Sequence, residues 1–573
     1  MNLDKRVRRL AVASIGSGVL LSLAFASDAM GWVAWVALVP MIVVLRDTSL
    51  TAAGLAGLAG GGIAALGTFG WLLVVPAVGP VQAMALALYL SLYLVCWCMG
   101  VVWLQRRRMP LLIGAPALWV ALDFLRAHAD FLALPWATLA QSQHTDLALL
   151  QLAALGGEAA VSFAVVMGNV AIASLVGQPL MAWHPWRSAA LAGSAIALAH
   201  GAGALMLLSD EPGPVLQVAA IQPSIGINER DSAAGRDAIW QRLERLTWQA
   251  ARLAPPTPQQ RMLVVWPETA VGDPRHDPQL AAKLAALANA TQAALIVGAA
   301  ETEKFVATEV VGQTLREVVR ERERYNSAYL VAPGAPLGEP YRKRRLVPFG
   351  ETTPLKDRLS WPAWLVPAIG EGQAGDDFTG FELAGTTSHG WRDAAHDVSP
   401  DVSHKAARVI AHNAAHEGPR QLAPVSVRIG VLICWENLFA DLSREAVRDQ
   451  AQVLVQLTND VWFGKTRASA QHNAVSVLRA VENRVPIVIA SNTGASQIVD
   501  AQGRIQTRVP GLFSQGVAVA SVAIGGAGTL YTRTGDVFSW ACIACAAAAL
   551  FTPRRLAWPA RRIQPTTLFK EST

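Results

Sequence analysis

Cys434 stands at the end of an apolar run, VLICWEN over 431–437, immediately before an aromatic residue and a carboxylate. It is the one cysteine in the polar part of the chain. The other cysteines fall in apolar segments, where small polarizable side chains pack readily: Cys96, Cys98, Cys542 and Cys545. A lone thiol cannot form an internal disulfide, so Cys434 is either a buried structural residue or a nucleophile.

A thiol nucleophile needs a base that takes its proton, and a cation or donor that stabilises the oxyanion formed when it attacks a carbonyl. Glu268 follows the apolar run LVVWP, and Lys343 follows another apolar run, within YRKRRLVPFGE. Residues at strand ends converge on one rim of a sheet, where sites on α/β folds are usually built. Glu268, Lys343 and Cys434 are therefore candidates for one catalytic site.

The polar block at 209–530 must supply the strands that position these residues. Apolar strand-like runs begin at 215, 262, 293, 325, 427, 451, 485 and 516, and amphipathic helical stretches alternate with them. Buried strands interleaved with helices predict an α/β sandwich whose sheets are covered by helices. The segment near 376–422 breaks this rhythm and is interpreted as a long inserted loop.

Long apolar segments predict that much of the remaining chain is membrane α-helical. The chain has 573 residues, of which 52% are apolar. About eight transmembrane helices are expected, at 10–27, 31–45, 51–75, 82–104, 110–125, 147–176, 188–208 and 536–552. The first segment also fits a cleavable signal peptide, although the spans that follow at once favour an uncleaved helix. The stretch GLAGLAGGG at 54–62 predicts close helix packing.

Basic residues indicate the orientation of the spans, because Lys and Arg near helix ends stay cytoplasmic. With the N-terminus inside, the expected cytoplasmic segments hold 14 Lys and Arg against three acidic residues. The net charge of +6 therefore reflects membrane topology and does not imply a nucleic-acid partner. Three regions are expected: a transmembrane domain at 1–208, an extracytoplasmic domain at 209–530, and a last transmembrane helix with a basic cytoplasmic tail at 531–573.

Three ordered motifs carry a resemblance: WPET at 266–269, YRKRRLVPFGE at 341–351 and ICWEN at 433–437. They resemble the Glu, Lys and Cys motifs of the nitrilase, or carbon-nitrogen hydrolase, superfamily. With the membrane segments around them, nearly the whole chain is similar to the bacterial apolipoprotein N-acyltransferase family. Further motifs that resemble this family follow from 457 onward: LTNDVWFG, QH, RAVENRVPIV and SNTGAS. The resemblance implies a nitrilase-like αββα sandwich.

The resemblance implies an acyltransferase of the bacterial inner membrane, with its catalytic domain facing the periplasm. The donor would be a phospholipid, typically phosphatidylethanolamine, and the acceptor a diacylated apolipoprotein. The acyl chain would be held as a thioester on Cys434 and then passed to the α-amine of the lipidated cysteine that begins the acceptor. No cofactor and no metal are implied, and a monomer is expected.

The resemblance also implies a role for each residue of the site. Glu268 would act as general base toward the thiol and later toward the attacking amine. Lys343 would stabilise the tetrahedral oxyanion together with the backbone N–H of Trp435. Glu351 would orient the lysine or the incoming amine.

Glu436 would support the loop that carries the nucleophile. Glu268, Lys343 and Glu351 each also have a purely structural alternative. Glu268 could cap a helix, the basic run around Lys343 could bind anionic headgroups, and Glu351 could be a turn residue. The ordered set, taken together with the cysteine, favours catalysis.

Three positions depart from the family pattern: Trp435 stands where tyrosine is usual, Arg345 where histidine is frequent, and Asp231 near the place of a tryptophan in a substrate arm. These departures leave the acyl-enzyme chemistry intact and put the acceptor in doubt. The insertion is also unusual, and its histidines are interpreted as a solvated loop in preference to a zinc site: His389, His396, His404, His412 and His416.

Two other functions stay open at this stage. One is a divergent paralogue of the same architecture that acylates another amine. The other is a membrane-anchored amidase that hydrolyses a small amide. Ionisable residues within the fifth span, Asp123 and Arg126, favour the acyltransferases, because a mere anchor needs neither these charges nor eight helices. The same two residues could alternatively form an ion pair near the outer interface.

Overall fold

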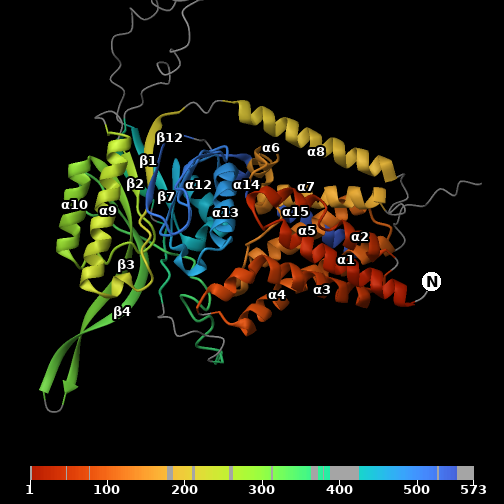
Figure 1. The fold of residues 1–573 in the computed structure, drawn as a ribbon, viewed down its shortest axis with the longest axis horizontal. Helices are drawn as coiled ribbons and strands as arrows, with labels where there is room; N and C mark the ends of the chain where they lie inside the picture. The colour runs from red at the N-terminus through yellow and green to blue at the C-terminus, as the bar shows by residue number, and fades with distance from the viewer. Residues whose placement is uncertain are drawn as a thin grey trace, which may run out of the picture.

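The computed structural model describes residues 3–46, 48–76, 78–176, 185–209, 213–256, 262–311, 314–362, 372–378, 380–386, 425–525 and 528–551. Two parts lie side by side along the long axis of the molecule, one built of helices and one built of strands with helices around them (Figure 1). The nucleophile candidate belongs to the second part, and the first contains nearly all of the long apolar helices.

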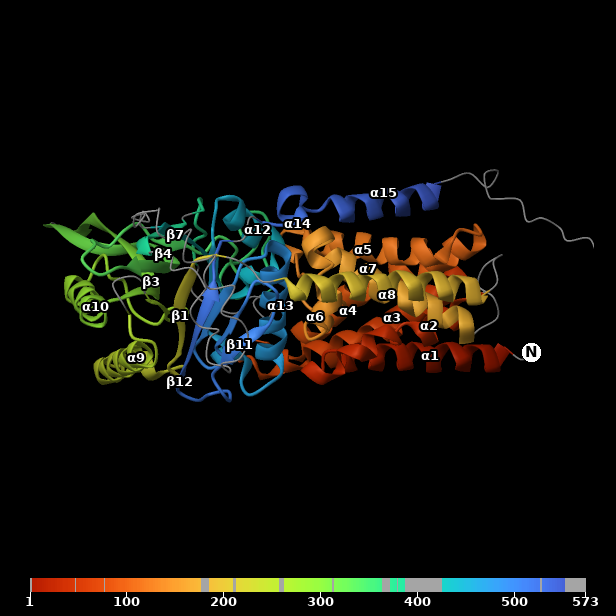
Figure 2. The same ribbon diagram turned by 90° about the horizontal axis from the view of Figure 1, so that it is seen from above.

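The helical part consists of segments that run along a common direction (Figure 2). Their bounds are α1 Leu3–Leu23, η1 Asp28–Trp35, α2 Val39–Leu45, α3 Leu50–Phe69, η2 Gly70–Val74, α4 Pro80–Arg106, α5 Leu111–Ala127, η3 Asp130–Leu132, η4 Gln141–Gln143, α6 Leu147–Leu150, α7 Ala153–Val176, α8 Pro185–Leu208 and α15 Val537–Phe551. The last of these, α15, returns from the far end of the chain and packs against α5 and α7.

Five segments of the described chain are long and apolar enough to cross a membrane: Asp28–Leu45, Leu50–Val74, Pro80–Arg106, Ala153–Val176 and Trp186–Leu208. The expected number of eight is therefore not confirmed. The other three expected spans correspond to α1, whose first turns are basic, to α5, which has 17 residues, and to the short apolar stretch Val537–Leu550 of α15. Several apolar helices that fit a membrane are present, in agreement with the expected class.

The expected span at 147–176 is wrong as a single helix. The chain forms the short helix α6 and then α7, and α7 is itself broken at Gly156 and Gly157. Gly157 has φ +67°, a backbone conformation in which side chains with a Cβ are disfavoured. A Cβ there would also lie 2.6 Å from the ring of Tyr531, so both the backbone and the packing require glycine.

Close packing through the glycine-rich stretch is confirmed. A Cβ on Gly57 would lie 2.7 Å from the backbone of Val95, and a Cβ on Gly61 would lie 2.7 Å from the Cα of Ser91. The backbones of α3 and α4 thus approach one another as small residues permit in membrane helices. Asp123 and Arg126 form an ion pair of 3.0 Å, which was one of the two alternatives for these residues.

The second part contains two six-stranded sheets, with strand orders β12-β1-β2-β3-β4-β5 and β11-β10-β9-β8-β7-β6. The strand bounds are β1 Val215–Gln222, β2 Met262–Val265, β3 Ala293–Val311, β4 Thr314–Val331, β5 Tyr341–Arg342, β6 Phe381–Thr386, β7 Val425–Ile433, β8 Val453–Thr458, β9 Ile487–Ser491, β10 Gln497–Val499, β11 Ile505–Arg508 and β12 Gly516–Ala523. β1, β2 and β3 are parallel, and so are β7, β8 and β9.

Helices cover the outer faces of the two sheets, which gives the expected α/β sandwich. The helices are α9 Ala233–Leu253 and α10 Pro278–Thr291 on the first sheet, and α12 Ala440–Arg448 and α13 Ala468–Asn483 on the second. Apolar side chains from both sheets meet between them and exclude water, among them Leu216, Val265, Ile296, Val431 and Val455. The parallel strands end at one rim of the sandwich, where polar side chains follow β2 and β7.

The eight expected strand runs all form strands, but four further strands were missed. β5, β6, β10 and β11 are two to six residues long and lie toward the edges of the two sheets, where apolar alternation is weak. β3 and β4 are also far longer than expected and form a ribbon that projects from the sandwich (Figure 1). The strand β6 lies inside the segment expected to be a loop, and the five histidines of that segment lie outside the described residues.

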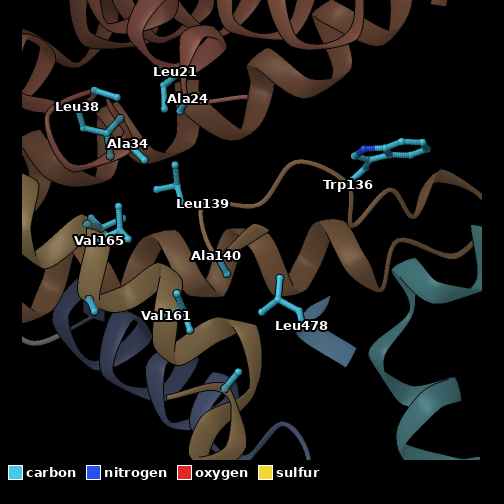
Figure 3. Packing of buried hydrophobic residues seen from close by; sticks show 14 of the residues in the cluster. Leu21, Ala24, Ala34, Leu38, Trp136, Leu139, Ala140, Val161, Val165 and Leu478 are labelled. Atoms are coloured by element: carbon cyan, nitrogen blue, oxygen red, sulfur yellow. The ribbon is translucent and has the colours of Figure 1, made fainter. Parts of the chain in front are cut away.

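One apolar cluster joins the helical part to the second sheet. It includes Val161 and Val165 of α7, Leu139 and Ala140 of the segment before it, and Leu478 of α13 (Figure 3). Buried charges cross the same boundary. Arg479 of α13 lies 2.8 Å from Glu158 of α7 and 3.2 Å from Glu482, whose other oxygen accepts the Glu158 backbone N–H at 2.9 Å.

Candidate active site

Cys434 begins the short helical turn η6 Cys434–Leu438, directly after β7. Its φ is +55°, in the left-handed region that a residue with a Cβ seldom adopts. A backbone conformation of this kind persists only where the surroundings hold it, and it occurs often at active sites. The side chain is half-buried, in contrast to the fully buried residues that flank it on β7.

Glu436 holds this turn in place. Its side chain is fully buried and accepts four hydrogen bonds: from Ile433 N at 2.7 Å, Arg344 N at 2.7 Å, Arg345 N at 3.0 Å and the Tyr341 hydroxyl at 2.9 Å. Burial raises the pKa of Glu436, and the backbone donors limit that rise. The carboxylate therefore ties the nucleophile turn to the segment that carries Lys343.

Lys343 is fully buried between carboxylates. Its Nζ lies 2.7 Å from an oxygen of Glu351 and 3.5 Å from an oxygen of Glu268. Burial alone would lower the pKa of Lys343, but the negative charges of Glu351, Cys434 and Glu268 raise it above its ordinary value. The group is therefore an ammonium ion with a fixed position, beside the thiol.

Glu268 follows β2 and is held by two donors, one on β4 and one directly after β8. Its Oε1 accepts from Asn326 Nδ2 at 2.5 Å, and its Oε2 accepts from the backbone N–H of Asn459 at 2.8 Å. Helix capping, its structural alternative, is wrong, because the next helix begins at Pro278 and is capped by Asp277. The carboxylate is thus oriented toward Lys343 by groups that the sequence did not single out.

Glu351 lies in a turn and also contacts the lysine. Its second oxygen accepts from Val347 N at 2.8 Å, and its side chain is 27% exposed. Both earlier interpretations, turn residue and partner of Lys343, therefore describe its contacts. Glu268 is only 8% exposed, so Glu351 lies at the more open end of the carboxylate pair.

The thiol of Cys434 interacts electrostatically with each of these charges. Burial, followed by the nearby Glu268 carboxylate, raises the pKa of Cys434 well above its ordinary value, and Lys343 opposes the rise. The resting group is consequently a neutral thiol, and its reaction with a carbonyl requires a base to take the proton. Glu268 raises the pKa of this thiol more than Glu351 does.

Two of the departures from the family pattern contact one another. The indole N–H of Trp435 donates to the carbonyl of Arg345 at 2.6 Å, and the Arg345 guanidinium lies 4.9 Å from the ring centre of Phe439. Trp435 also packs edge-on against Phe439, with 5.2 Å between the ring centres. Asp231 ends the short turn η5 Glu229–Asp231, on the segment that follows β1.

Several polar residues around the site carried no assigned role in the sequence. Asn326 and Asn459 bind Glu268. A buried polar group lies beside the nucleophile turn and consists of Gln456 on β8, Asp460 of LTNDVWFG and His472 of QH. Strand-end position would have found Asn459, since it follows β8. Within the described ranges, no three His, Cys, Asp or Glu side chains are placed to hold a metal ion.

The arrangement has the parts needed for acyl transfer through sulfur: a thiol, a carboxylate that can take its proton, and a buried ammonium beside both. This is the chemistry expected of a carbon-nitrogen hydrolase site. The described strands and helices supply the fold of that class, with all three groups at the strand ends of one sandwich.

Comparisons with known proteins agree with this class. Residues 217–531 match the family model described as Carbon-nitrogen hydrolase, and residues 17–171 match the Apolipoprotein N-acyltransferase N-terminal domain. A protein of Geobacter metallireducens named Apolipoprotein N-acyltransferase is 30% identical, with 95% of each chain covered. One of the same name from Chlorobaculum tepidum is 25% identical, with 76% of this chain and 75% of the other covered.

Among solved structures, an amidase from Nesterenkonia sp. is similar at 13% identity and a TM-score of 0.34, covering 58% of this chain and 97% of the amidase. Fold, site and family models define a carbon-nitrogen hydrolase domain joined to apolar helices. The chain belongs to the apolipoprotein N-acyltransferase family of that superfamily, and it is an acyltransferase.

Proposed function

We propose that this enzyme transfers a fatty acyl chain from a phospholipid, through a thioester on Cys434, to the N-terminal amine of a diacylglyceryl-cysteine in an apolipoprotein. The buried Lys343 ammonium, placed between Glu268 and Glu351 and beside the thiol, is the observation that supports this most directly. A fixed cation in a water-poor site stabilises an oxyanion far better than solvent does.

In the first half-reaction, Glu268 takes the proton of the Cys434 thiol as the sulfur attacks an ester carbonyl of the phospholipid. A carbon–sulfur bond forms and the carbonyl oxygen becomes an oxyanion, which Lys343 and the Trp435 backbone N–H stabilise. The carbon–oxygen bond to glycerol then breaks. The leaving alkoxide receives the proton from Glu268, so a lysophospholipid departs and the acyl group stays on sulfur.

In the second half-reaction, the α-amine of the acceptor attacks the thioester carbonyl and Glu268 takes a proton from the amine. The carbon–nitrogen bond forms, the carbon–sulfur bond breaks, and the thiol regains a proton. Glu351 is 27% exposed beside Lys343, which suits a group that meets the incoming amine and orients it. The amide product and the free enzyme result, with no cofactor in the balance.

We also propose that the site faces the periplasm from the inner membrane. The basic ends of the apolar helices support this orientation, because Lys and Arg resist translocation. The orientation is tested by labelling with a membrane-impermeant maleimide. Two variants each carry one added cysteine at an exposed position, Gln279→Cys on α10 and Arg9→Cys on α1. Labelling of the first and not the second in intact spheroplasts is expected. Labelling of the second alone would reverse the topology.

Transfer is tested with purified enzyme in detergent, phosphatidylethanolamine with a labelled acyl chain, and a synthetic diacylglyceryl-cysteine peptide. The expected product is an N-acylated peptide that is absent with Cys434→Ser. An acyl-enzyme that forms but does not pass to this peptide would favour a paralogue with another acceptor, a reading prompted by Trp435, Arg345 and Asp231. Complementation of a strain depleted of its own lipoprotein N-acyltransferase separates the same two functions in cells.

A further inference from the structure

A chain of buried polar groups runs from Asp460 to the backbone of the nucleophile. Gln456 Nε2 lies 3.3 Å from the Cys434 carbonyl oxygen and 3.4 Å from His472 Nε2, and His472 Nδ1 lies 3.4 Å from Asp460 Oδ1. All three side chains are buried, and the residues come from β8, from the turn η7 Asp460–Phe463 and from α13.

The contacts fix the direction of every hydrogen bond in the chain. Ser476 donates to Gln456 Oε1, so the amide nitrogen of Gln456 is the atom that faces both the Cys434 carbonyl and His472. Since an amide N–H can only donate, His472 Nε2 must be the acceptor and Nδ1 must carry the proton. That proton points at Asp460, whose pKa is lowered because its hydrogen bonds and the imidazole outweigh its burial.

The imidazole is also fixed from the side of the apolar helices. Trp136, in the segment between η3 and η4, stacks on His472 with 5.4 Å between ring centres and an interplanar angle of 26°. Thr458 holds the acceptor oxygen of Asp460 at 2.9 Å. The contacts of His472 fix its tautomer, the orientation of its ring and its charged partner. It is therefore a preorganised polar group and not simply a residue that packs in the core.

The last hydrogen bond of this series is accepted by the Cys434 carbonyl, which belongs to the same planar peptide group as the Trp435 N–H. A hydrogen bond to the carbonyl draws electron density from the nitrogen and strengthens that N–H as a donor. It also fixes the orientation of this peptide plane, directly after a residue held in the left-handed region with a φ of +55°.

We propose that Gln456, oriented by His472 and Asp460, is a positioning residue that polarises the Cys434–Trp435 peptide and aims its N–H at the oxyanion. It acts through the peptide and touches no substrate. The inference rests on the proposed function to the extent that this N–H serves as an oxyanion donor. It adds three residues, none of which carried a role in the sequence, to the groups that determine the rate of acylation.

The test uses the full-length enzyme acylated from phosphatidylethanolamine whose acyl carbonyl is ¹³C-labelled, with the thioester stretch measured by isotope-edited infrared spectroscopy. A stronger oxyanion donor lowers that frequency. Gln456→Met keeps the shape and removes the donor, so its band should move to higher wavenumber and acylation should slow roughly tenfold, less than the roughly 10²–10³ for loss of a whole donor. Asp460→Asn should shift the band in the same direction, by less.

The matched control is Asn473→Ala on α13, the helix that carries His472. It deletes a bond of 2.7 Å to the Ala495 carbonyl and leaves the chain to Cys434 intact. Its melting temperature should fall while its thioester band stays at the wild-type position. Bands at the wild-type position in folded Gln456→Met or Asp460→Asn, with acylation within twofold of wild type, would overturn the inference. A wild-type enzyme that forms no acyl adduct would instead refute the proposed function, and with it this inference.

Discussion

Replacing Lys343 with methionine should separate the catalytic and structural effects of the buried charges. Lys343 is fully buried, with Glu351 at 2.7 Å and Glu268 at 3.5 Å. Methionine fills much of the same space but leaves two carboxylates facing one another. Breaking a buried ion pair in this way costs about 3–5 kcal/mol of folding free energy. Because Glu351 is partly exposed and retains its bond from Val347 N, the lower end of that range is expected.

The second change, Glu351→Gln in the Lys343→Met background, removes one of the two facing charges. Residues in direct contact couple by about 0.5–3 kcal/mol, so the double variant should recover part of the lost stability. Acylation should not recover, since the oxyanion has lost its cation. A deficit of at least roughly 10²–10³-fold in acylation is expected for both variants.

Two assays on the same preparations distinguish the effects: a thermal shift in detergent for stability, and the rate of acyl-enzyme formation for catalysis. Glu351→Gln alone should lose less stability than Lys343→Met, because its lysine keeps Glu268 as a partner. A double variant that regained acylation along with stability would show that Lys343 is not the cation of the oxyanion. Acylation by Lys343→Met within threefold of wild type would exclude the same role.

Three further outcomes follow from the described contacts. The rate at which iodoacetamide alkylates Cys434, followed by mass spectrometry, should rise roughly tenfold per pH unit between pH 7 and 8.5, because the raised pKa of Cys434 leaves little thiolate at neutral pH. A plateau of the rate in this range would contradict the raised pKa. Glu436→Gln should unfold at a lower temperature and acylate slowly, because its amide cannot accept all four donors; wild-type values for both would show that the turn is held otherwise. Burial raises the pKa of Glu482 to about 8 against an ordinary 4.5, so the folded state holds this proton more tightly than the unfolded state and stability falls as the pH rises through 8. Glu482→Gln should flatten the pH dependence of the melting temperature between pH 5 and 8.5. Equal slopes for the variant and the wild type would exclude this cause.

Apolar periodicity predicted the strands that place the site, because buried parallel strands appear as unbroken apolar runs. β1, β2, β7, β8 and β9 were all expected, and with them the strand-end positions of Glu268 and Cys434. The edge strands β5, β6 and β11, and β10 next to one edge, were missed, since such short strands have little apolar pattern. The projecting ribbon of β3 and β4 was missed for a related reason: its outer half is rich in charged residues.

The membrane part was predicted less well than the sandwich. Hydrophobicity finds long helices but does not find a break such as the one at Gly156 and Gly157, which depends on packing against Tyr531. Nor does it decide whether short apolar helices such as α5 and α15 cross a bilayer.

Contacts between side chains distant in sequence were beyond the reach of motifs. Asn326 on β4 and the backbone N–H of Asn459, directly after β8, orient Glu268, and the polarity around them carries no periodic signal. The chain from Asp460 to the Cys434 carbonyl joins residues of three elements in the same manner.

Acylation of Cys434 is tested most directly by locating the acyl group after a single turnover without acceptor. The enzyme is incubated with phosphatidylethanolamine, digested, and the peptide carrying Cys434 is analysed by mass spectrometry before and after hydroxylamine. The expected result is one added acyl chain on Cys434, removed by hydroxylamine and absent from Cys434→Ser. An acyl group on any other residue, or an adduct that persists in Cys434→Ser, would contradict it.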